Sequence, residues 1–119
     1  MERVSLTVHR LDERNKFSEG ISTLTTAIDG TAGAEFLMNE RDDKYLVLVQ
    51  NAATSEKTVT IKHGNGIQGV CDLEDKIPAS GYKFVQLESG RFKNVSGEDK
   101  GKVIITGDAN IKAAVFKLP

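Results

Sequence analysis

Apolar residues occur in this chain as short runs with a period of two, and this pattern constrains the fold more than any other feature. Val4, Leu6 and Val8 alternate with polar residues, and Val59 and Ile61 alternate in the same way. Successive side chains of a strand point to opposite faces, so this period predicts strands with one buried face. Segment 44–50 is apolar on both faces, which predicts a strand through the centre of the domain.

Further apolar runs are separated by turn residues. They lie at 34–38, 72–77, 82–87, 102–106 and 111–118. Gly, Asn, Asp and Pro fill the links between them, as turns require. About seven or eight strands at roughly ten-residue spacing predict an all-β fold. We expect a single antiparallel β-sandwich, Ig-like or jelly-roll-like, with little or no helix. Residues 1–119 form one domain in this interpretation, with 11–27 an irregular segment or long loop.

Charge and composition narrow the classes of partner. The chain has 16 basic and 17 acidic residues and a net charge of −1, so no basic footprint indicates a nucleic-acid partner. No apolar stretch approaches the roughly 20 residues of a membrane helix, and the N-terminus lacks the pattern of a secretory signal. The single cysteine, Cys71, fits synthesis in a reducing cytosol. We therefore expect neither nucleic acid nor membrane as a partner.

Residues 64–69 match the dinucleotide fingerprint G-x-G-x-x-G. That chemistry requires a helix to begin at the glycines, so that the pyrophosphate lies at its N-terminus. Only about nine residues separate Gly69 from Pro78, too few for a crossover helix. We interpret the glycines as a loop that needs close backbone approach or positive φ, and we expect no cofactor.

The residue patterns that could indicate a metal site or a catalytic nucleophile are as weak as the match to the dinucleotide motif. His9, His63 and Cys71 do not have the spacing of a metal site, and a pair of Cys71 with His63 lacks an orienting third residue. The acidic stretch 72–75 comes nearest to a calcium loop, although solvated turn residues explain it as well. The sequence thus predicts a protein that is not an enzyme, with no catalytic or metal-binding residues and no small-molecule substrate.

Arg91, Phe92 and Lys93 are the candidate partner contact. An aromatic residue between two cations in a loop has two interpretations: Phe92 plugs one end of the sandwich, or it is an exposed anchor for a partner protein. Most other aromatic residues lie within apolar strand patterns. That placement favours a role in the core over a stacking platform for sugars or bases.

The order of these pieces resembles the small head decoration (auxiliary capsid or cement) proteins of tailed bacteriophages. The likeness covers most of residues 28–119, and it departs at 11–19 and at 95–100. It rests on Asp29-Gly30, the strand ending at Asn51, Thr58-Val59-Thr60-Ile61, the Gly loop ending in 69–73, the turn Ile77-Pro78-Ala79-Ser80-Gly81, Phe92, and the closing runs 101–106 and 111–115.

The resemblance implies a function as well as a fold. It implies a virion structural protein at the capsid surface, synthesised in the bacterial host cytoplasm, that stabilises an assembled head. The implied partners are the major capsid protein and further copies of the chain, as a homo-oligomer such as a trimer. Two alternatives stay open: a tail, neck or fibre-associated virion module, and a carbohydrate- or surface-binding β-sandwich domain.

Overall fold

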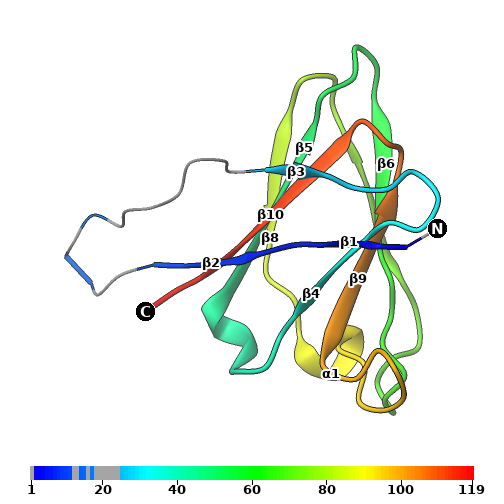
Figure 1. The fold of residues 1–119 in the computed structure, drawn as a ribbon. Helices are drawn as coiled ribbons and strands as arrows, with labels where there is room; N and C mark the ends of the chain where they lie inside the picture. The colour runs from blue at the N-terminus through cyan, green and yellow to red at the C-terminus, as the bar shows by residue number, and fades with distance from the viewer. Residues whose placement is uncertain (1, 12–13, 16, 18–24) are drawn as a thin grey trace.

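Two β-sheets enclose one apolar core in the computed structural model, which describes residues 2–11, 14–15, 17 and 25–119. The all-β expectation is confirmed. The strands are β1 (Val4–Ser5), β2 (Val8–Arg10), β3 (Thr26–Ala27), β4 (Ala34–Leu37), β5 (Tyr45–Asn51), β6 (Lys57–Ile61), β7 (Leu73–Ile77), β8 (Tyr82–Val85), β9 (Lys102–Gly107) and β10 (Ile111–Lys117). Figure 1 shows their arrangement.

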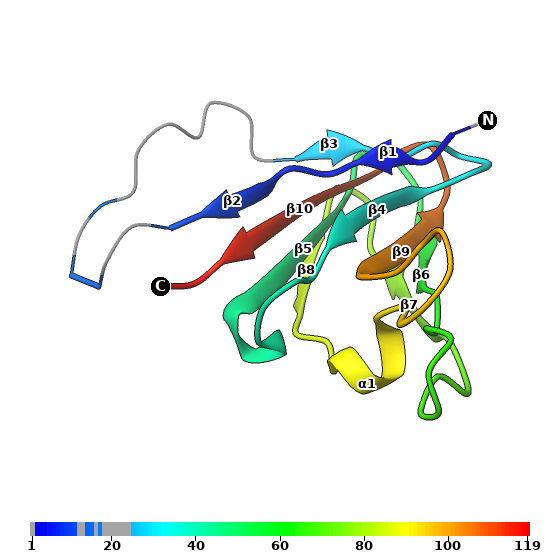
Figure 2. The same cartoon turned by 60° about the horizontal axis from the view of Figure 1, so that its bottom comes forward.

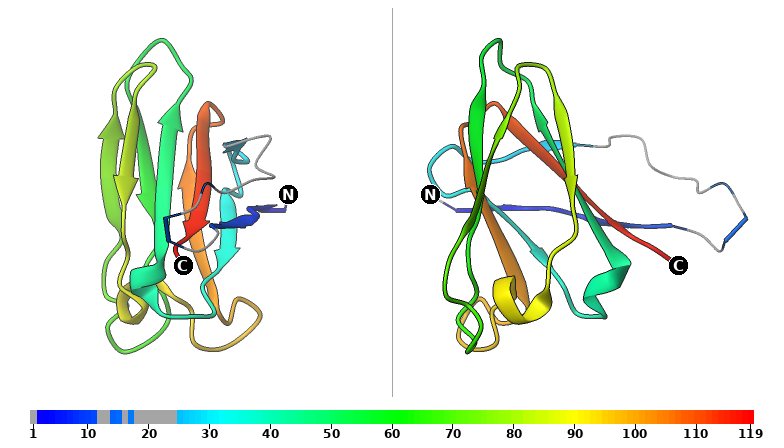
Figure 3. Two further views of the ribbon diagram at one scale, coloured as in Figure 1. Left: turned by 90° about the vertical axis from the view of Figure 1, so that its left-hand side faces the viewer. Right: turned by 180° about the vertical axis from the view of Figure 1, so that it is seen from behind.

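Each sheet has its own strand order. Sheet I runs β1-β4-β9-β6-β7, and sheet II runs β2-β10-β5-β8, with β3 also paired to β10. Figure 2 shows β1 and β2 along one side of the molecule, next to β4 and β10, and the two views of Figure 3 show β7 and β8 on the other side and the two layers of strands. β5 lies between β10 and β8, and even its outward-facing Leu48 is buried, which accounts for a sequence that is apolar on both faces.

Parallel pairing at the N-terminus corrects the expectation of a purely antiparallel sandwich. β1 pairs in parallel with β4, and β2 pairs in parallel with β10. The alternating stretch expected as one strand is divided, because the chain crosses from sheet I to sheet II between Ser5 and Val8. Alternation reports which face of a strand is buried, but it carries no information about the neighbouring strand.

The core follows the predicted alternation. Val59 and Ile61 point inward and are buried, while Thr58 and Lys62 are exposed. Phe36 and Tyr45 pack with their ring centroids 6.2 Å apart. The remaining buried apolar side chains come from both sheets and include Val47, Val49, Val103, Ile105, Ile111 and Val115.

Helix is confined to two short turns in the described part of the chain. They are η1 (Asp42–Lys44) and α1 (Ser89–Phe92). Neither is long enough to cross a membrane. The segment 11–27, expected to be irregular, ends in strand β3, which pairs with β10; residues 12–13, 16 and 18–24 lie outside the described part.

The gap between the edges of β4 and β10 is a closed seam. The stretch from β1 to β2 lies along both edges, and Leu6 between them is buried in the core. Arg3 fastens this stretch: its Nε lies 2.8 Å from Glu35 Oε1, and its Nη2 lies 2.5 Å from Asp99 Oδ1. Lys102 Nζ contacts the other oxygen of Glu35 at 2.8 Å. The seam is thus held by backbone pairing, a buried side chain and an ionic network.

The gap between β7 and β8 is an open seam. A cleft of about 270 Å³ opens there onto core side chains that include Val49, Ile61 and Ile77. Asp75 and Lys83 span the seam, with Lys83 Nζ 3.0 Å from Asp75 Oδ2. No β7–β8 strand pairing is present in the described sheets, so this seam is linked by side chains and by the 78–81 turn that joins the two strands.

Candidate binding surface

The glycines of the 62–72 loop allow backbone segments to approach each other closely. A Cβ atom on Gly69 would lie 2.1 Å from the carbonyl oxygen of Gly64, and one on Gly64 would lie 2.3 Å from that of Lys93. Neither glycine has a positive φ, so close approach is the reason for glycine here. The loop leads into strand β7 and not into a helix, which removes the helix terminus that a dinucleotide would need.

Asn65 joins this loop to the 93–101 loop. Its side-chain nitrogen donates to the carbonyl oxygen of Ser96 at 3.0 Å, and its side-chain oxygen accepts from the backbone N–H of Val95 at 2.7 Å. The N–H of Gly64 donates to the carbonyl of Arg91 at 2.8 Å. Two loops far apart in the sequence therefore form one braced unit.

Apolar side chains stand exposed on this braced unit. Ile67 is 99% exposed, Val70 78% and Val95 52%; we call these three residues the loop tip. The side chain of Val95 lies beside Gly66, where an added Cβ atom would be 3.6 Å from its methyl groups. Exposed apolar groups on a preorganised loop lose little conformational entropy on binding, so they suit a protein contact.

The three residues of the predicted partner contact, 91–93, differ in their exposure to solvent. Phe92 is 3% exposed and belongs to the core, so its ring is a plug and not an exposed anchor. Arg91 lies over that ring, with its guanidinium carbon 4.8 Å from the centroid, and its Nη2 lies 3.3 Å from Cys71 Sγ. Arg91 thus links α1 to the glycine loop. Contact of Arg91 or Lys93 with a partner stays a prediction.

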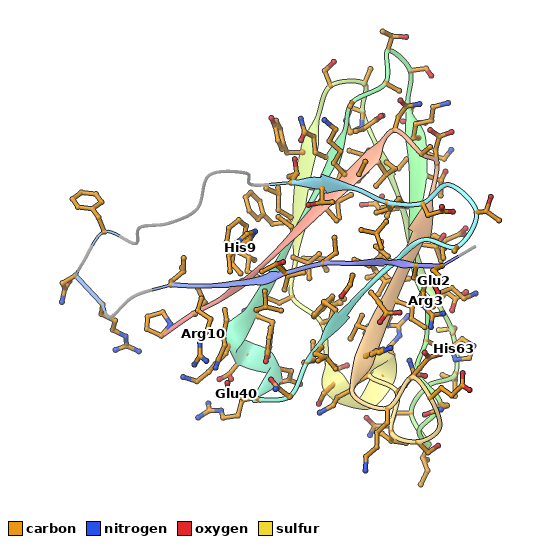
Figure 4. All side chains as sticks on the ribbon, viewed as in Figure 1. Glu2, Arg3, His9, Arg10, Glu40 and His63 are labelled. Atoms are coloured by element: carbon orange, nitrogen blue, oxygen red, sulfur yellow. The ribbon has the colours of Figure 1, made fainter. Side chains whose placement is uncertain are left out.

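Of the three residues considered for metal or nucleophilic chemistry, His63 and Cys71 lie in the same loop, and His9 lies in β2. Figure 4 shows His9 and His63 in separate parts of the molecule, and the His9 ring packs on Phe116 with centroids 5.7 Å apart. Asp72 accepts from the backbone N–H of His63 at 2.8 Å and from Lys62 Nζ at 2.9 Å. These bonds hold the pKa of Asp72 below its usual value. Within the described ranges, no three potential ligands gather into a metal site.

The outer face of sheet II carries a second exposed apolar group that strand patterns did not single out. Cross-strand pairing aligns Phe84 with Leu48 and Ala114, and aligns Tyr82 with Gln50. Leu48 and Ala114 are covered, whereas Tyr82 and Phe84 are 58% and 62% exposed. The Tyr82 hydroxyl lies 3.2 Å from Gln50 Nε2. Two aromatic residues on one face of an edge strand therefore reach solvent.

The sequence alone could have indicated the loop tip through one signal. Ile67 and Val70 are apolar residues within a glycine-rich loop, outside any alternating run. Comparison of the chain with protein-family models, curated proteins and solved structures finds no match.

Proposed function

We propose that this protein is a virion structural protein that decorates and stabilises a tailed-phage head by binding the assembled shell. The observation that carries the proposal is the loop tip, three exposed apolar side chains held on two loops that Asn65 and the glycines brace. Such a tip fits an apolar depression on a protein surface. Repetition of a modest contact over a symmetric shell gives high occupancy through avidity.

The strand order supports a finer description of the fold. Strands β3 to β10 divide into the sets β3-β10-β5-β8 and β4-β9-β6-β7, all paired antiparallel. This is the order of an eight-stranded jelly roll, an architecture used by viral capsid and lectin domains. In this interpretation, the stretch from β1 to β2 is an added strand that closes one seam. The resemblance to head decoration proteins agrees with such a scaffold.

Co-sedimentation with heads tests the proposal. Heads of the phage that carries the gene, assembled without this protein, are mixed with purified chain and pelleted. We expect saturable binding, and we expect the double variant I67D/V70D to bind at least about 30-fold more weakly, as for a central apolar contact. Both positions are exposed, so thermal unfolding of the variant should match that of the parent chain.

The control variant is Y82S/F84S, which removes a comparable exposed apolar area from sheet II. It should bind heads like the parent chain. Absence of binding by the parent chain to heads, or equal loss in both variants, would contradict the proposed role of the loop tip.

The exposed pair Tyr82 and Phe84 favours a second candidate, a carbohydrate-binding face. Aromatic faces stack on apolar sugar faces, and the neighbouring Gln50 amide supplies polar contacts. A glycan array with the parent chain and both double variants separates the candidates. Binding that Y82S/F84S removes and I67D/V70D retains would favour the sugar-binding function, whereas no glycan binding would remove this candidate.

A further inference from the structure

The outer edge of β7 is free. β7 pairs with β6 along all five of its residues, and it is the last strand of sheet I. No other described strand pairs with its outer edge. A free edge presents backbone N–H and C=O groups that can pair with another strand. What the edge selects therefore depends on its side chains.

The side chains of β7 are self-complementary about the middle residue. The strand reads Leu73, Glu74, Asp75, Lys76, Ile77, so an apolar residue stands at each end and opposite charges flank the centre. We propose that β7 pairs antiparallel with β7 of a second copy, with a two-fold axis at Asp75. In this register, Glu74 of one copy lies opposite Lys76 of the other, and the reciprocal pair forms by symmetry.

In this register, four of the five side chains of β7 lie opposite a complementary side chain. Glu74 and Lys76 are exposed on the outer face, where opposite charges in directly facing positions stabilise a strand pair. Leu73 and Ile77 point toward the core, and each would lie opposite the other's equivalent. A shift of one residue would set the core face of one copy beside the outer face of the other, so Leu73 and Ile77 would no longer lie opposite apolar partners. The register is therefore selected by charge and by burial together.

Asp75 sets the limit on affinity. Two Asp75 carboxylates would face each other at the axis, and like charges in directly facing positions oppose pairing. Each carboxylate already has a cation of its own copy, with Lys83 Nζ 3.0 Å away, and it accepts from the backbone N–H of Lys76 at 2.8 Å, a bond that pairing with a second copy would have to replace. Lys83 therefore offsets only part of the repulsion, and the remainder, together with the bond to Lys76 that must be replaced, keeps the dimer weak.

The second copy would also cover the mouth of the open seam. Leu73, Asp75 and Val85 line the cleft there. A five-residue strand pair is smaller than a standard interface, so we expect a Kd on the order of 100 µM. On a shell, where copies are concentrated, such a contact would be occupied.

Sedimentation equilibrium from about 10 µM to 1 mM tests the inference on the full chain. The parent chain should shift from monomer toward dimer across this range. E74K places two cations opposite each other, and it should weaken the dimer about tenfold or more. The double variant E74K/K76E exchanges the charges and should restore it. K76E alone is less clean, because Lys76 also lies 4.0 Å from Glu56 in its own chain.

Two further variants complete the design. D75N removes the facing charges and should tighten the dimer, while E98K reverses an exposed charge away from β7 and should leave it unchanged. A parent chain that stays monomeric at 1 mM, a trimer, or failure of the charge exchange to restore pairing would overturn the inference. The loop tip is a different surface, so loss of dimer formation and loss of head binding are separate results.

Discussion

The closed seam and the open seam both join the two sheets, but they do so through different interactions. At the closed seam, the β1–β2 stretch pairs with both sheets and buries Leu6 in the core. At the open seam, one ion pair and one buried amide link the sheets: Asp75 with Lys83, and Asn51, whose Nδ2 donates to the carbonyl of Ile77 at 3.0 Å. Backbone pairing and burial resist changes of pH and salt, whereas an exposed ion pair is screened.

This difference locates where the molecule can accept a partner. The closed seam already has its extra strand, so its edges are occupied. The open seam retains a free strand edge and a cleft onto the core. One seam thus has its strand edges occupied and the other has a free edge, and the variants below compare how much each seam contributes to stability.

The largest effect is expected at the closed seam, from Leu6→Ala. Removal of a buried leucine side chain leaves a cavity and should lower the free energy of unfolding by about 2–5 kcal/mol. Urea denaturation measures it. Leu37→Ala is the matched control, because Leu37 is 52% exposed on the adjacent β4, and it should cost under about 0.5 kcal/mol. Equal costs for the two variants would mean that Leu6 contributes no more than a surface residue.

The next largest effect is expected at the open seam, from Asn51→Ala. Asn51 is fully buried and also donates to the carbonyl of Ser55 at 2.8 Å and accepts from the N–H of Ala53 at 2.9 Å. Loss of this amide leaves buried backbone groups unpaired and should cost about 2–3 kcal/mol. Relative to the parent chain, the variant should show faster amide hydrogen exchange in β7, with a smaller change in β1. An unchanged exchange rate in β7 would argue against a role for Asn51 in holding that strand.

A smaller and pH-dependent effect is expected from Glu35→Gln. Burial raises the pKa of Glu35, but hydrogen bonds from Arg3 and Lys102 outweigh it, so the folded-state pKa lies below the usual value. The stabilisation is therefore present above the unfolded-state pKa and is lost as pH falls through the folded-state pKa. At pH 7 the variant should lose about 1 kcal/mol.

The pH profile is the decisive measurement for Glu35. The difference in unfolding free energy between the parent chain and Glu35→Gln should shrink as pH falls from about 5 to 3. Other carboxylates with lowered pKa values, such as Asp72, are present in both proteins and cancel. A difference that stays constant with pH would show that Glu35 acts through packing alone.

The smallest effect is expected from Asp75→Asn and Lys83→Met at low protein concentration. The Asp75 and Lys83 side chains are 60% and 44% exposed, and exposed ion pairs of this kind contribute little. Thermal unfolding at a few micromolar should not distinguish either variant from the parent chain. A clear loss in both would mean that the ion pair holds the open seam more strongly than its exposure implies.

Sequence reasoning recovered the strands because burial on one face leaves a period of two, as at Val59 and Ile61. It did not predict features that depend on contacts between segments distant in the sequence. The division of the first strand depends on two edges, of β4 and β10, that are distant in the sequence. The plug role of Phe92 was one of two open interpretations until its surroundings were known. The loop tip was missed because Ile67 and Val70 belong to no periodic run, and their exposure follows from braces between separate loops.

In the 62–72 loop, the residues that fix the backbone conformation differ from those whose side chains are exposed to solvent. Gly64 and Gly69 are held by contacts between main chains, so the shape requires nothing of the side chains at positions 67 and 70. We expect replacements at these two positions to leave the fold of the loop unchanged, so under the proposed function one or two substitutions would suffice to change which surface the loop tip binds. Under that proposal, the residues that contact the partner can change while the backbone conformation of the loop stays the same.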